Sequence, residues 1–254
     1  MKLSGNTILI TGGSTGIGLA FARKFKEMGN EIIITGRSQA KLDAAAADLP
    51  GISTIQCDAA SVADITRMAA EIRDKHPKCN VLLNNAGIFL NKNLAAEGVD
   101  LESLTIEVDI NVSGCIRTVA ALIGQLKANR GTIINVSSGL AFVPLVSAPI
   151  YCATKAALHA YTLSLREQLN GTGVEVIELM PPAVKTELTA DLPEGDITLI
   201  TTDVLINDTI KALQAGKAEI RVGQANQLHW MSRIAPNFIR AQLAKASRSL
   251  IPDA

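Results

Sequence analysis

The chain has 254 residues and a formal net charge of zero, with 24 basic and 24 acidic side chains. Without a charge excess, the composition gives no reason to expect a nucleic-acid or membrane partner. No apolar run reaches the roughly 18 residues that span a bilayer, and the first predicted strand begins too close to Met1 for a signal peptide. The four cysteines form no C-x-x-C pair and no cluster with histidine at metal-binding spacing. We therefore expect free thiols, no metal and a cytoplasmic protein.

The first predicted element is a buried strand over residues 6–10. It leads into a turn that contains Gly12, Gly16 and Gly18, and then into an amphipathic helix that ends at Gly29. A strand, a glycine-rich turn and a helix in this order let backbone N–H groups approach a phosphate at the helix N-terminus. The sequence therefore predicts a pyrophosphate site, although the glycine spacing is not the common G-x-G-x-x-G.

Short strands and longer helices alternate along the rest of the chain. We expect strands at 31–35, 54–57, 81–83, 132–136, 174–179 and 219–222, and helices at 38–49, 61–75, 101–128, 151–170 and 202–215. This alternation predicts an α/β, doubly wound Rossmann fold with a seven-stranded, mostly parallel sheet and helices on both faces. No repeat or linker interrupts it, so residues 1–254 are predicted to form a single domain with a C-terminal helical tail from about residue 225.

Tyr151 and Lys155 are the most informative pair in the sequence. Four residues apart on a predicted helix, they lie on the same face. A neighbouring ammonium favours the phenolate and lowers the tyrosine pKa from its ordinary value of about 10. A tyrosine tuned toward neutral pH can exchange a proton with an alcohol or a carbonyl oxygen. Taken alone, Tyr-x-x-x-Lys more often marks a solvated surface pair.

Four motifs together resemble the single-domain branch of the short-chain dehydrogenase/reductase family. They are the T-G-x-x-x-G-I-G turn, Asn-Asn-Ala-Gly at 84–87, a serine thirteen positions before Tyr151, and Tyr-x-x-x-Lys. The stretches 137–144 and 151–159 and the pair Pro181-Pro182 are similar to the DltE-like oxidoreductase subgroup, whose name defines no substrate. The resemblance implies an NAD(P)-dependent enzyme that acts on CH–OH or C=O groups.

The resemblance also implies a catalytic tetrad of Asn111, Ser138, Tyr151 and Lys155. In this family the tyrosine protonates the alkoxide left by hydride transfer. The lysine lowers the tyrosine pKa and binds the nicotinamide ribose, and the serine fixes the substrate oxygen. The asparagine sits at a helix kink and positions a water that relays protons. Ser137 is a rival to Ser138, although the thirteen-residue offset favours Ser138.

NADP(H) is the expected cofactor, with NAD(H) as the alternative. An acid after the second strand would bind the 2′-hydroxyl of NAD, whereas an arginine suits the 2′-phosphate of NADP. The chain has Gly36 and Arg37 there. Arg37 could instead be a solvated loop residue, and Asp58 a turn residue rather than an adenine contact. The expected cofactor-binding residues are Gly12, Ser14, Thr15, Gly16, Ile17, Gly18, Arg37, Asp58, Ala59, Asn85, Ala86, Gly87, Tyr151, Lys155, Pro181, Val184 and Thr186.

The chain departs from the family pattern in two places. Pro182 replaces the usual glycine after the sixth strand and removes an N–H donor near the nicotinamide. The tail lacks the usual Asp-Gly-Gly ending, and its apolar residues are expected to pack in the core; they are Trp230, Met231, Ile234, Phe238, Ile239 and Leu243. The family resemblance and the apolar helices predict a homodimer or homotetramer, and the changed tail favours the dimer.

The expected function is NADP(H)-dependent hydride transfer to or from a carbonyl or secondary alcohol of a small, mainly apolar substrate. The residues that suggest an apolar pocket are Phe89, Leu90, Leu140, Phe142, Val143, Leu145, Val146, Ile150 and Leu188. Two alternatives stay open: an NAD-dependent alcohol dehydrogenase, and a non-catalytic nucleotide-sensing protein on the same fold. An intact tetrad argues against the second. His159 has no evident catalytic partner in the sequence and is expected to be structural.

Overall fold

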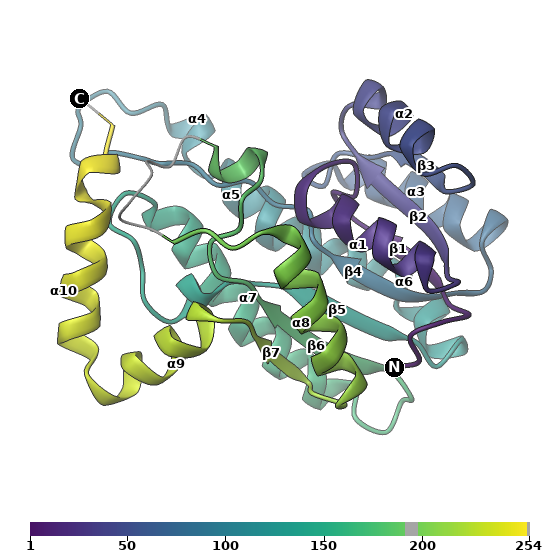
Figure 1. Cartoon of the computed structure of the whole chain (residues 1–254). Coiled ribbons are helices and arrows are strands. Elements are labelled where there is room, and N and C mark those ends of the chain that lie inside the picture. The colour runs from purple at the N-terminus through teal and green to yellow at the C-terminus, as the bar shows by residue number, and fades with distance from the viewer. Residues whose placement is uncertain (191–197, 253–254) are drawn as a thin grey trace.

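The computed structural model describes residues 1–190 and 198–252. One sheet forms its centre, with strand order β3-β2-β1-β4-β5-β6-β7 and parallel pairing between all neighbours (Figure 1). The strands are β1 Thr7–Ile10, β2 Glu31–Gly36, β3 Ser53–Gln56, β4 Cys79–Asn84, β5 Thr132–Val136, β6 Glu175–Met180 and β7 Glu219–Arg221. The strand order reverses between β1 and β4, which opens a crevice at their carboxyl ends. The predicted doubly wound fold is confirmed.

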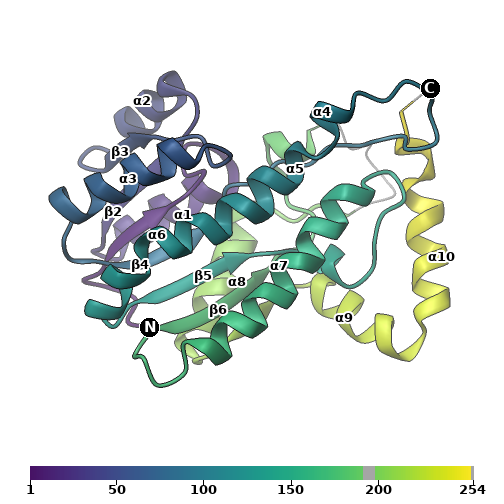
Figure 2. The same cartoon turned by 180° about the vertical axis from the view of Figure 1, so that it is seen from behind.

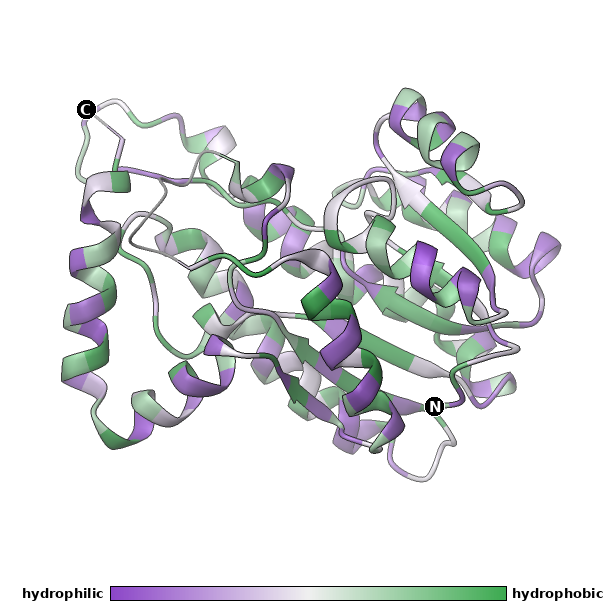
Figure 3. Ribbon diagram, viewed as in Figure 1, coloured by the Kyte–Doolittle hydropathy of each residue, from purple (hydrophilic) through white to green (hydrophobic). Residues whose placement is uncertain are grey.

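Helices cover both faces of the sheet. They are α1 Gly16–Glu27, α2 Gln39–Asp48, α3 Val62–Lys75, α4 Leu101–Leu104, α5 Ile106–Val108, α6 Cys115–Ala128, α7 Pro149–Gln168, α8 Thr202–Gln214, α9 Gln224–Ile234 and α10 Pro236–Ser247. Figure 1 shows α1 and α8 on one face, and Figure 2 shows α3, α6 and α7 on the other. Successive strand residues point to opposite faces, so Ile8 and Ile10 pack with Phe21 of α1, whereas Leu9 packs with Met68 of α3. Figure 3 shows the resulting pattern of hydrophobic strands between amphipathic helices.

The helix expected at 101–128 is interrupted. A turn at Thr105 separates α4 from α5, and Asp109–Gly114 forms a π-helical segment before α6 begins. Such segments accommodate an inserted residue and often occur at functional sites. Gly114 lies so close to the backbone of Ala59 that a Cβ would come within 2.5 Å of the Ala59 carbonyl oxygen. The irregularity expected at Asn111 is therefore present as this π-helical segment, but the prediction of a single continuous helix was wrong.

Ser61 caps the N-terminus of α3 without forming a full capping box. The Ser61 hydroxyl accepts a hydrogen bond from the Asp64 N–H (3.2 Å), as expected of an N-cap. The Asp64 carboxylate does not return to Ser61; it accepts from the backbone N–H of Asp58 (2.9 Å). This second bond ties α3 to the loop after β3, which borders the crevice.

The tail forms two helices at the outer edge of the molecule (Figure 1). Ile239 is buried, but Trp230, Ile234 and Phe238 are 53%, 76% and 63% exposed. The expectation that the apolar tail residues pack in the core was wrong for these three, because each lies on the face turned away from the rest of the chain. In the described part of the protein, no helix is long and apolar enough to cross a bilayer.

Candidate active site

The glycine-rich turn between β1 and α1 is held by the loop after β4. Gly12 has a φ of 63°, in the left-handed region that favours glycine. A Cβ at Gly18 would lie 2.3 Å from the Gly12 carbonyl oxygen. The Asn85 side-chain amide donates to the carbonyls of Thr11 (3.1 Å) and Gly12 (3.0 Å). The turn is therefore compact, and a backbone this close to the crevice can approach a phosphate.

A cavity of about 830 Å³ extends from this turn along the carboxyl ends of the strands. It brings together nearly all the site residues that the sequence predicted. Those on its wall are Gly12, Ser14, Thr15, Gly16, Ile17, Arg37, Asp58, Ala59, Asn85, Ala86, Gly87, Ser138, Tyr151, Lys155, Pro181, Val184 and Thr186. Gly18 and Asn111 are not among the lining residues. Both lie behind the wall, where Gly18 packs on the turn and Asn111 on the loop after β4.

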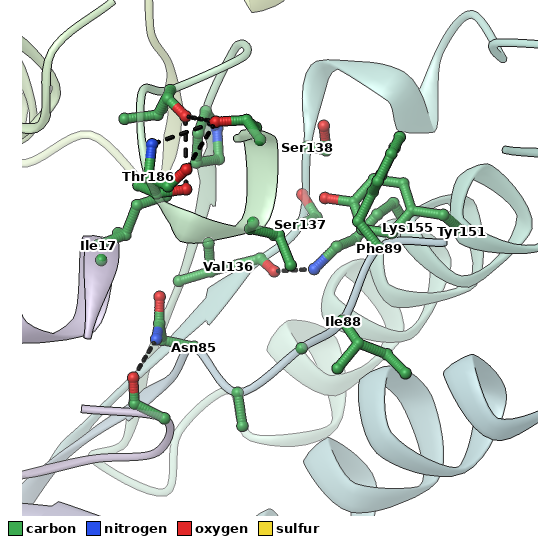
Figure 4. A pocket seen from close by; sticks show the side chains of 18 of the residues that line it. Ile17, Asn85, Ile88, Phe89, Val136, Ser137, Ser138, Tyr151, Lys155 and Thr186 are labelled. Carbon is green, nitrogen blue, oxygen red and sulfur yellow. Dashed lines mark hydrogen bonds between the residues drawn. The ribbon is translucent and has the colours of Figure 1, made fainter. Parts of the chain in front are cut away.

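Tyr151, Lys155 and Ser138 meet at one end of the cavity (Figure 4). The Lys155 Nζ lies 5.4 Å from the centroid of the Tyr151 ring, as the spacing on α7 predicted. It donates to the Val136 carbonyl oxygen at 2.9 Å, at the end of β5. The Phe89 ring contacts the tyrosine edge-on, with 4.9 Å between centroids. The phenol is therefore held between a buried ammonium and an aromatic ring.

The pKa values at this end differ from the expectation. Burial raises the pKa of Tyr151 above its ordinary value; the neighbouring Cys152 and Glu107 act in the same direction, and the Ser138 hydroxyl opposes them. Burial lowers the pKa of Lys155 to about 8. The expected lowering of the Tyr151 pKa by Lys155 was wrong for the protein alone, because desolvation of the phenol outweighs its neighbour's charge. The tyrosine is therefore a protonated acid at neutral pH.

Asn111 anchors the loop that follows β4. Its side-chain oxygen accepts from the Ile88 N–H (2.8 Å), and its amide donates to the Ile88 carbonyl (2.9 Å) and to the Thr154 hydroxyl (3.1 Å). Gly87 separates it from the cavity, since a Cβ there would lie 3.2 Å from the Asn111 oxygen and 3.7 Å from the Lys155 Nζ. Asn111 is thus next to Lys155, and its direct contacts are with the loop and with α7.

Ser137 and Ser138 have different partners. The Ser137 hydroxyl donates to a carboxylate oxygen of the fully buried Glu178. The Ser138 hydroxyl accepts from the Leu140 N–H at 3.1 Å and faces Tyr151. The other Glu178 oxygen bonds His159 Nδ1 at 2.8 Å, and this hydrogen bond raises the pKa of His159. Ser137 is therefore committed to Glu178, and His159 has the buried partner that the sequence did not reveal.

Two further residues of the site were missed in the sequence. Glu107 is buried next to the active-site end of α7, where it accepts from the Leu90 N–H at 3.0 Å, and burial raises its pKa. Lys41 lines the cavity near Arg37 and pairs with Glu187 at 2.6 Å. An acid between Ile106 and Val108, four positions before Asn111, was a signal for Glu107; an exposed lysine on α2 gave none.

At the opposite end of the cavity, Arg37 is exposed after β2. Its carbonyl accepts from the Gln56 side chain at 2.9 Å, which fixes its backbone. The Ser14 hydroxyl lies beside Gly36, 3.0 Å from where a Cβ would be. Asp58 accepts from the Ala60 N–H at 2.9 Å, so one carboxylate oxygen serves the turn. Ser14, Arg37 and Lys41 thus all line this end of the cavity with hydrogen-bond donors.

The segment after β6 closes the cavity between these ends. The Pro181 carbonyl accepts from the Gly139 N–H at 3.0 Å, which places the Pro181-Pro182 pair beside Ser138. Val184 pairs with Ile200 in a parallel bridge. The Thr186 N–H donates to the Thr189 hydroxyl at 3.1 Å. Pro182 supplies no N–H, so the polar groups of this wall come from its neighbours.

The substrate end is formed in part by the tail. Of the nine apolar residues expected there, four line the cavity: Phe89, Leu140, Leu145 and Leu188. Helices α9 and α10 add side chains that the sequence did not assign to the site, namely Gln224, Gln227, Leu228, Met231, Ile239, Gln242, Leu243 and Ala246. The tail therefore covers the active site with one face while its other face stays exposed.

The comparisons with known proteins identify the family. Residues 6–197 match the family model described as short chain dehydrogenase. The chain belongs to the short-chain dehydrogenase/reductase family and is an NAD(P)-dependent oxidoreductase. Within that family it is DltE-like: it is 41% identical over 224 residues to the uncharacterized oxidoreductase DltE of Bacillus subtilis (strain 168), which covers 87% of this chain and 89% of that protein.

Other relatives differ in the cofactor that their names state. The chain is 35% identical over 192 residues to the NADP-dependent 3-hydroxy acid dehydrogenase YdfG of Salmonella typhi, covering 74% of this chain and 77% of that one. A short chain dehydrogenase from Burkholderia cenocepacia J2315, solved with NADP, has a TM-score of 0.84 and 26% identity over 96% of this chain and 99% of that chain. A 3-ketoacyl-(acyl-carrier-protein) reductase from Brucella melitensis, solved with NADH, has a TM-score of 0.76 and 27% identity over 83% and 91%.

Proposed function

We propose that the protein is an NADP(H)-dependent oxidoreductase that interconverts a carbonyl group and a secondary alcohol on a small, uncharged, mainly apolar substrate. The observation that carries this proposal is the placement of Tyr151 and Lys155 on the wall of the cavity that begins at the glycine-rich turn. One cavity thus joins a phosphate-binding turn to a proton donor. That combination is what hydride transfer to a carbonyl requires.

The residues of the cavity fit a nicotinamide dinucleotide. The glycine turn and the N-terminus of α1 suit the pyrophosphate, because the left-handed φ of Gly12 and the tight packing of Gly18 bring the backbone close to the crevice. The Arg37 guanidinium and the Ser14 hydroxyl suit a 2′-phosphate. Val184 and Thr186, which line the cavity after β6, would hold the nicotinamide carboxamide. When bound, the cofactor supplies or accepts the hydride.

Each polar residue at the reacting end has a distinct role in this proposal. Tyr151 gives its phenolic proton to the substrate oxygen during reduction, and its raised pKa keeps that proton in place at neutral pH. Ser138 orients the same oxygen, since its hydroxyl is not committed to Glu178 as that of Ser137 is. Lys155 binds the ribose and stabilises the phenolate that forms. Asn111 holds the loop and α7 in register beside Lys155.

The lining of the substrate end supports an uncharged substrate. Among the described lining residues, the cations are Arg37 and Lys41 at the adenosine end and Lys155 at the reacting end. A hydroxy acid or keto acid would need a further cation for its carboxylate, since a buried charge requires a partner. The tail supplies glutamine amides instead, from Gln224, Gln227 and Gln242. These suit hydroxyl, amide or ester groups on an apolar skeleton.

A cofactor titration tests the nucleotide preference. The binding of NADPH and of NADH is followed by nicotinamide fluorescence for the parent and for Arg37→Ala. We expect the substitution to weaken NADPH by at least tenfold and to change NADH by less than threefold, because a charge-assisted hydrogen bond contributes about 1.5–3 kcal/mol. Lys41→Ala tests whether the second cation shares the role. Equal losses for both nucleotides would contradict the NADP(H) assignment.

A substrate panel tests the reaction itself. Aldehydes, ketones and β-keto acids of matched length are offered with NADPH, and secondary alcohols and serine with NADP, while absorbance at the NADPH band is recorded. We expect turnover on uncharged carbonyl compounds and values of kcat/KM at least tenfold lower for the matched acids. Faster turnover of the acids would overturn the uncharged class while leaving the oxidoreductase assignment intact.

A further inference from the structure

The outward face of the tail exposes large apolar side chains. Trp230, Ile234 and Phe238 surround the corner at Ala235 where α9 passes into α10, and all three are more than half exposed. Inward residues of the same helices, such as Leu228 and Leu243, line the cavity. One face of the tail therefore already packs against the rest of the chain. Trp230, Ile234 and Phe238 lie on the other face and do not contribute to that packing. Exposed apolar groups of this size gathered at one corner mark an interaction site.

The same tail carries an excess of positive charge. Residues 224–254 contain four arginines and lysines and one acid, Asp253, although the whole chain is neutral. Arg233, Arg240, Lys245 and Arg248 are exposed. Within residues 1–190 and 198–252, none of these four forms an ion pair with an acid. The net charge of zero thus conceals a basic tail and an acidic remainder.

The charges decide between two kinds of partner. A second copy of this chain docked by a two-fold contact would set the same basic tail against itself, because such an interface is self-complementary. Like charges placed together disfavour that contact. An anionic bilayer surface instead offers headgroups for the cations and an acyl boundary for the tryptophan, isoleucine and phenylalanine.

We propose that α9 and α10 dock the protein on the surface of an anionic lipid bilayer. The helices lie on the surface and do not cross it, which agrees with their length and their amphipathic pattern. Figures 1 and 2 show α10 at the outer edge of the molecule, where it is free to meet a flat surface. The neutral net charge of the whole chain gave no reason to expect a membrane partner, and this proposal departs from that expectation. It does not depend on whether the protein is catalytically active.

Vesicle sedimentation tests the proposal with the full chain. The vesicles are phosphatidylcholine alone, or equal parts of phosphatidylcholine and phosphatidylglycerol, each at low and at physiological salt. We expect binding to the mixed vesicles that weakens with salt, and at least tenfold weaker binding to phosphatidylcholine. Arg240→Gln, Lys245→Gln and Arg248→Gln together should weaken binding roughly a hundredfold at low salt, since each cation near the surface contributes about fivefold.

A matched control removes three exposed lysines elsewhere, by Lys78→Gln, Lys127→Gln and Lys217→Gln. It should bind vesicles within threefold of the parent. A second pair, Ile234→Gln and Phe238→Gln, should lose binding while keeping NADPH affinity and the circular dichroism spectrum, because neither residue lines the cavity. Val62→Gln, at an apolar residue 59% exposed on α3, is its control.

Three results would overturn the proposal. One is absence of binding to the mixed vesicles at low salt. Another is equal weakening by the tail variant and by the lysine control, which would indicate non-specific attraction. The third combines two observations: the parent is a dimer in light scattering but does not bind vesicles, and the Ile234→Gln, Phe238→Gln variant is a monomer. A second copy of the chain would then be the occupant of this face.

Discussion

Replacing Lys155 by methionine should make the protein inactive and should remove a gain in stability that the parent makes as the pH rises. Methionine has a similar length and fills the same buried space without a charge. Lys155 is only 4% exposed, and its pKa of about 8 in the folded chain lies below its ordinary 10.5. The folded state therefore disfavours the proton that the unfolded chain holds, so this lysine destabilises the parent at neutral pH.

The size of the effect follows from the two pKa values. Between pH 8 and 10.5 the unfolded chain binds more protons at this residue than the folded chain does, so stability rises with pH in that window. A difference of this size corresponds to about 3 kcal/mol at pH 7, of which about 1 kcal/mol persists at pH 9.5. Methionine removes that cost but leaves the Val136 carbonyl without its donor, at a loss of about 1–3 kcal/mol.

Urea unfolding of parent and variant at pH 7 and pH 9.5 isolates the lysine. Tyrosines and cysteines also titrate in this range. Those that are not coupled to Lys155 are common to both proteins and cancel in the difference; Cys115, whose pKa the Lys155 charge lowers, is the exception. We expect the stability of Lys155→Met relative to the parent to be about 2 kcal/mol more favourable at pH 7 than at pH 9.5. Parallel pH curves for the two proteins would refute the description of Lys155 as a desolvated ammonium.

Three other predictions concern the turn, the two serines and the assembly. Gly18→Ala should cost about 3 kcal/mol or more of unfolding free energy and abolish NADPH binding, because its Cβ would meet the Gly12 carbonyl; Gly124→Ala, with nothing within 4 Å, should be neutral or stabilising in thermal unfolding. Ser138→Ala should lower kcat at least tenfold and leave the urea midpoint nearly unchanged. Ser137→Ala should lower the urea midpoint and leave kcat nearly unchanged, because it removes a hydrogen-bond donor from the buried Glu178. A large loss of kcat in Ser137→Ala with none in Ser138→Ala would contradict the separate roles of the two serines. Light scattering at micromolar concentration should give a homodimer through the helices beside the sheet, and a monomeric mass would count against it.

The fold and the ends of the cavity were accessible from the sequence because they depend on local patterns. The buried strand before Gly12 and the helix that contains Gly18 predict a phosphate-binding turn without reference to the rest of the chain. The four-residue spacing of Tyr151 and Lys155 likewise fixes their common face on α7. Chain order and the rule that ligands bind at strand ends then place these groups at one edge.

The parts that failed depend on burial and on long-range contacts. Spacing alone predicted a lowered Tyr151 pKa, but desolvation by neighbours far apart in sequence reverses the direction. The bond between His159 and Glu178 joins α7 to β6, and no local pattern announces it. The exposure of Ile234 and Phe238 was missed for the same reason, since an amphipathic pattern says that two faces differ but not what each one contacts.

The central claim is that Tyr151 is the proton donor of an NADP(H)-dependent oxidoreductase, and Tyr151→Phe tests it most directly. Phenylalanine keeps the ring packed against Phe89 but has no hydroxyl. The measurement is kcat on the best carbonyl substrate of the panel, with the NADPH dissociation constant determined on the same samples. We predict a loss of at least about 10²-fold in kcat, the usual range for general acid catalysis, and an NADPH dissociation constant within threefold of the parent. A variant that retains most of the parent's rate would contradict the assignment of Tyr151 as the proton donor.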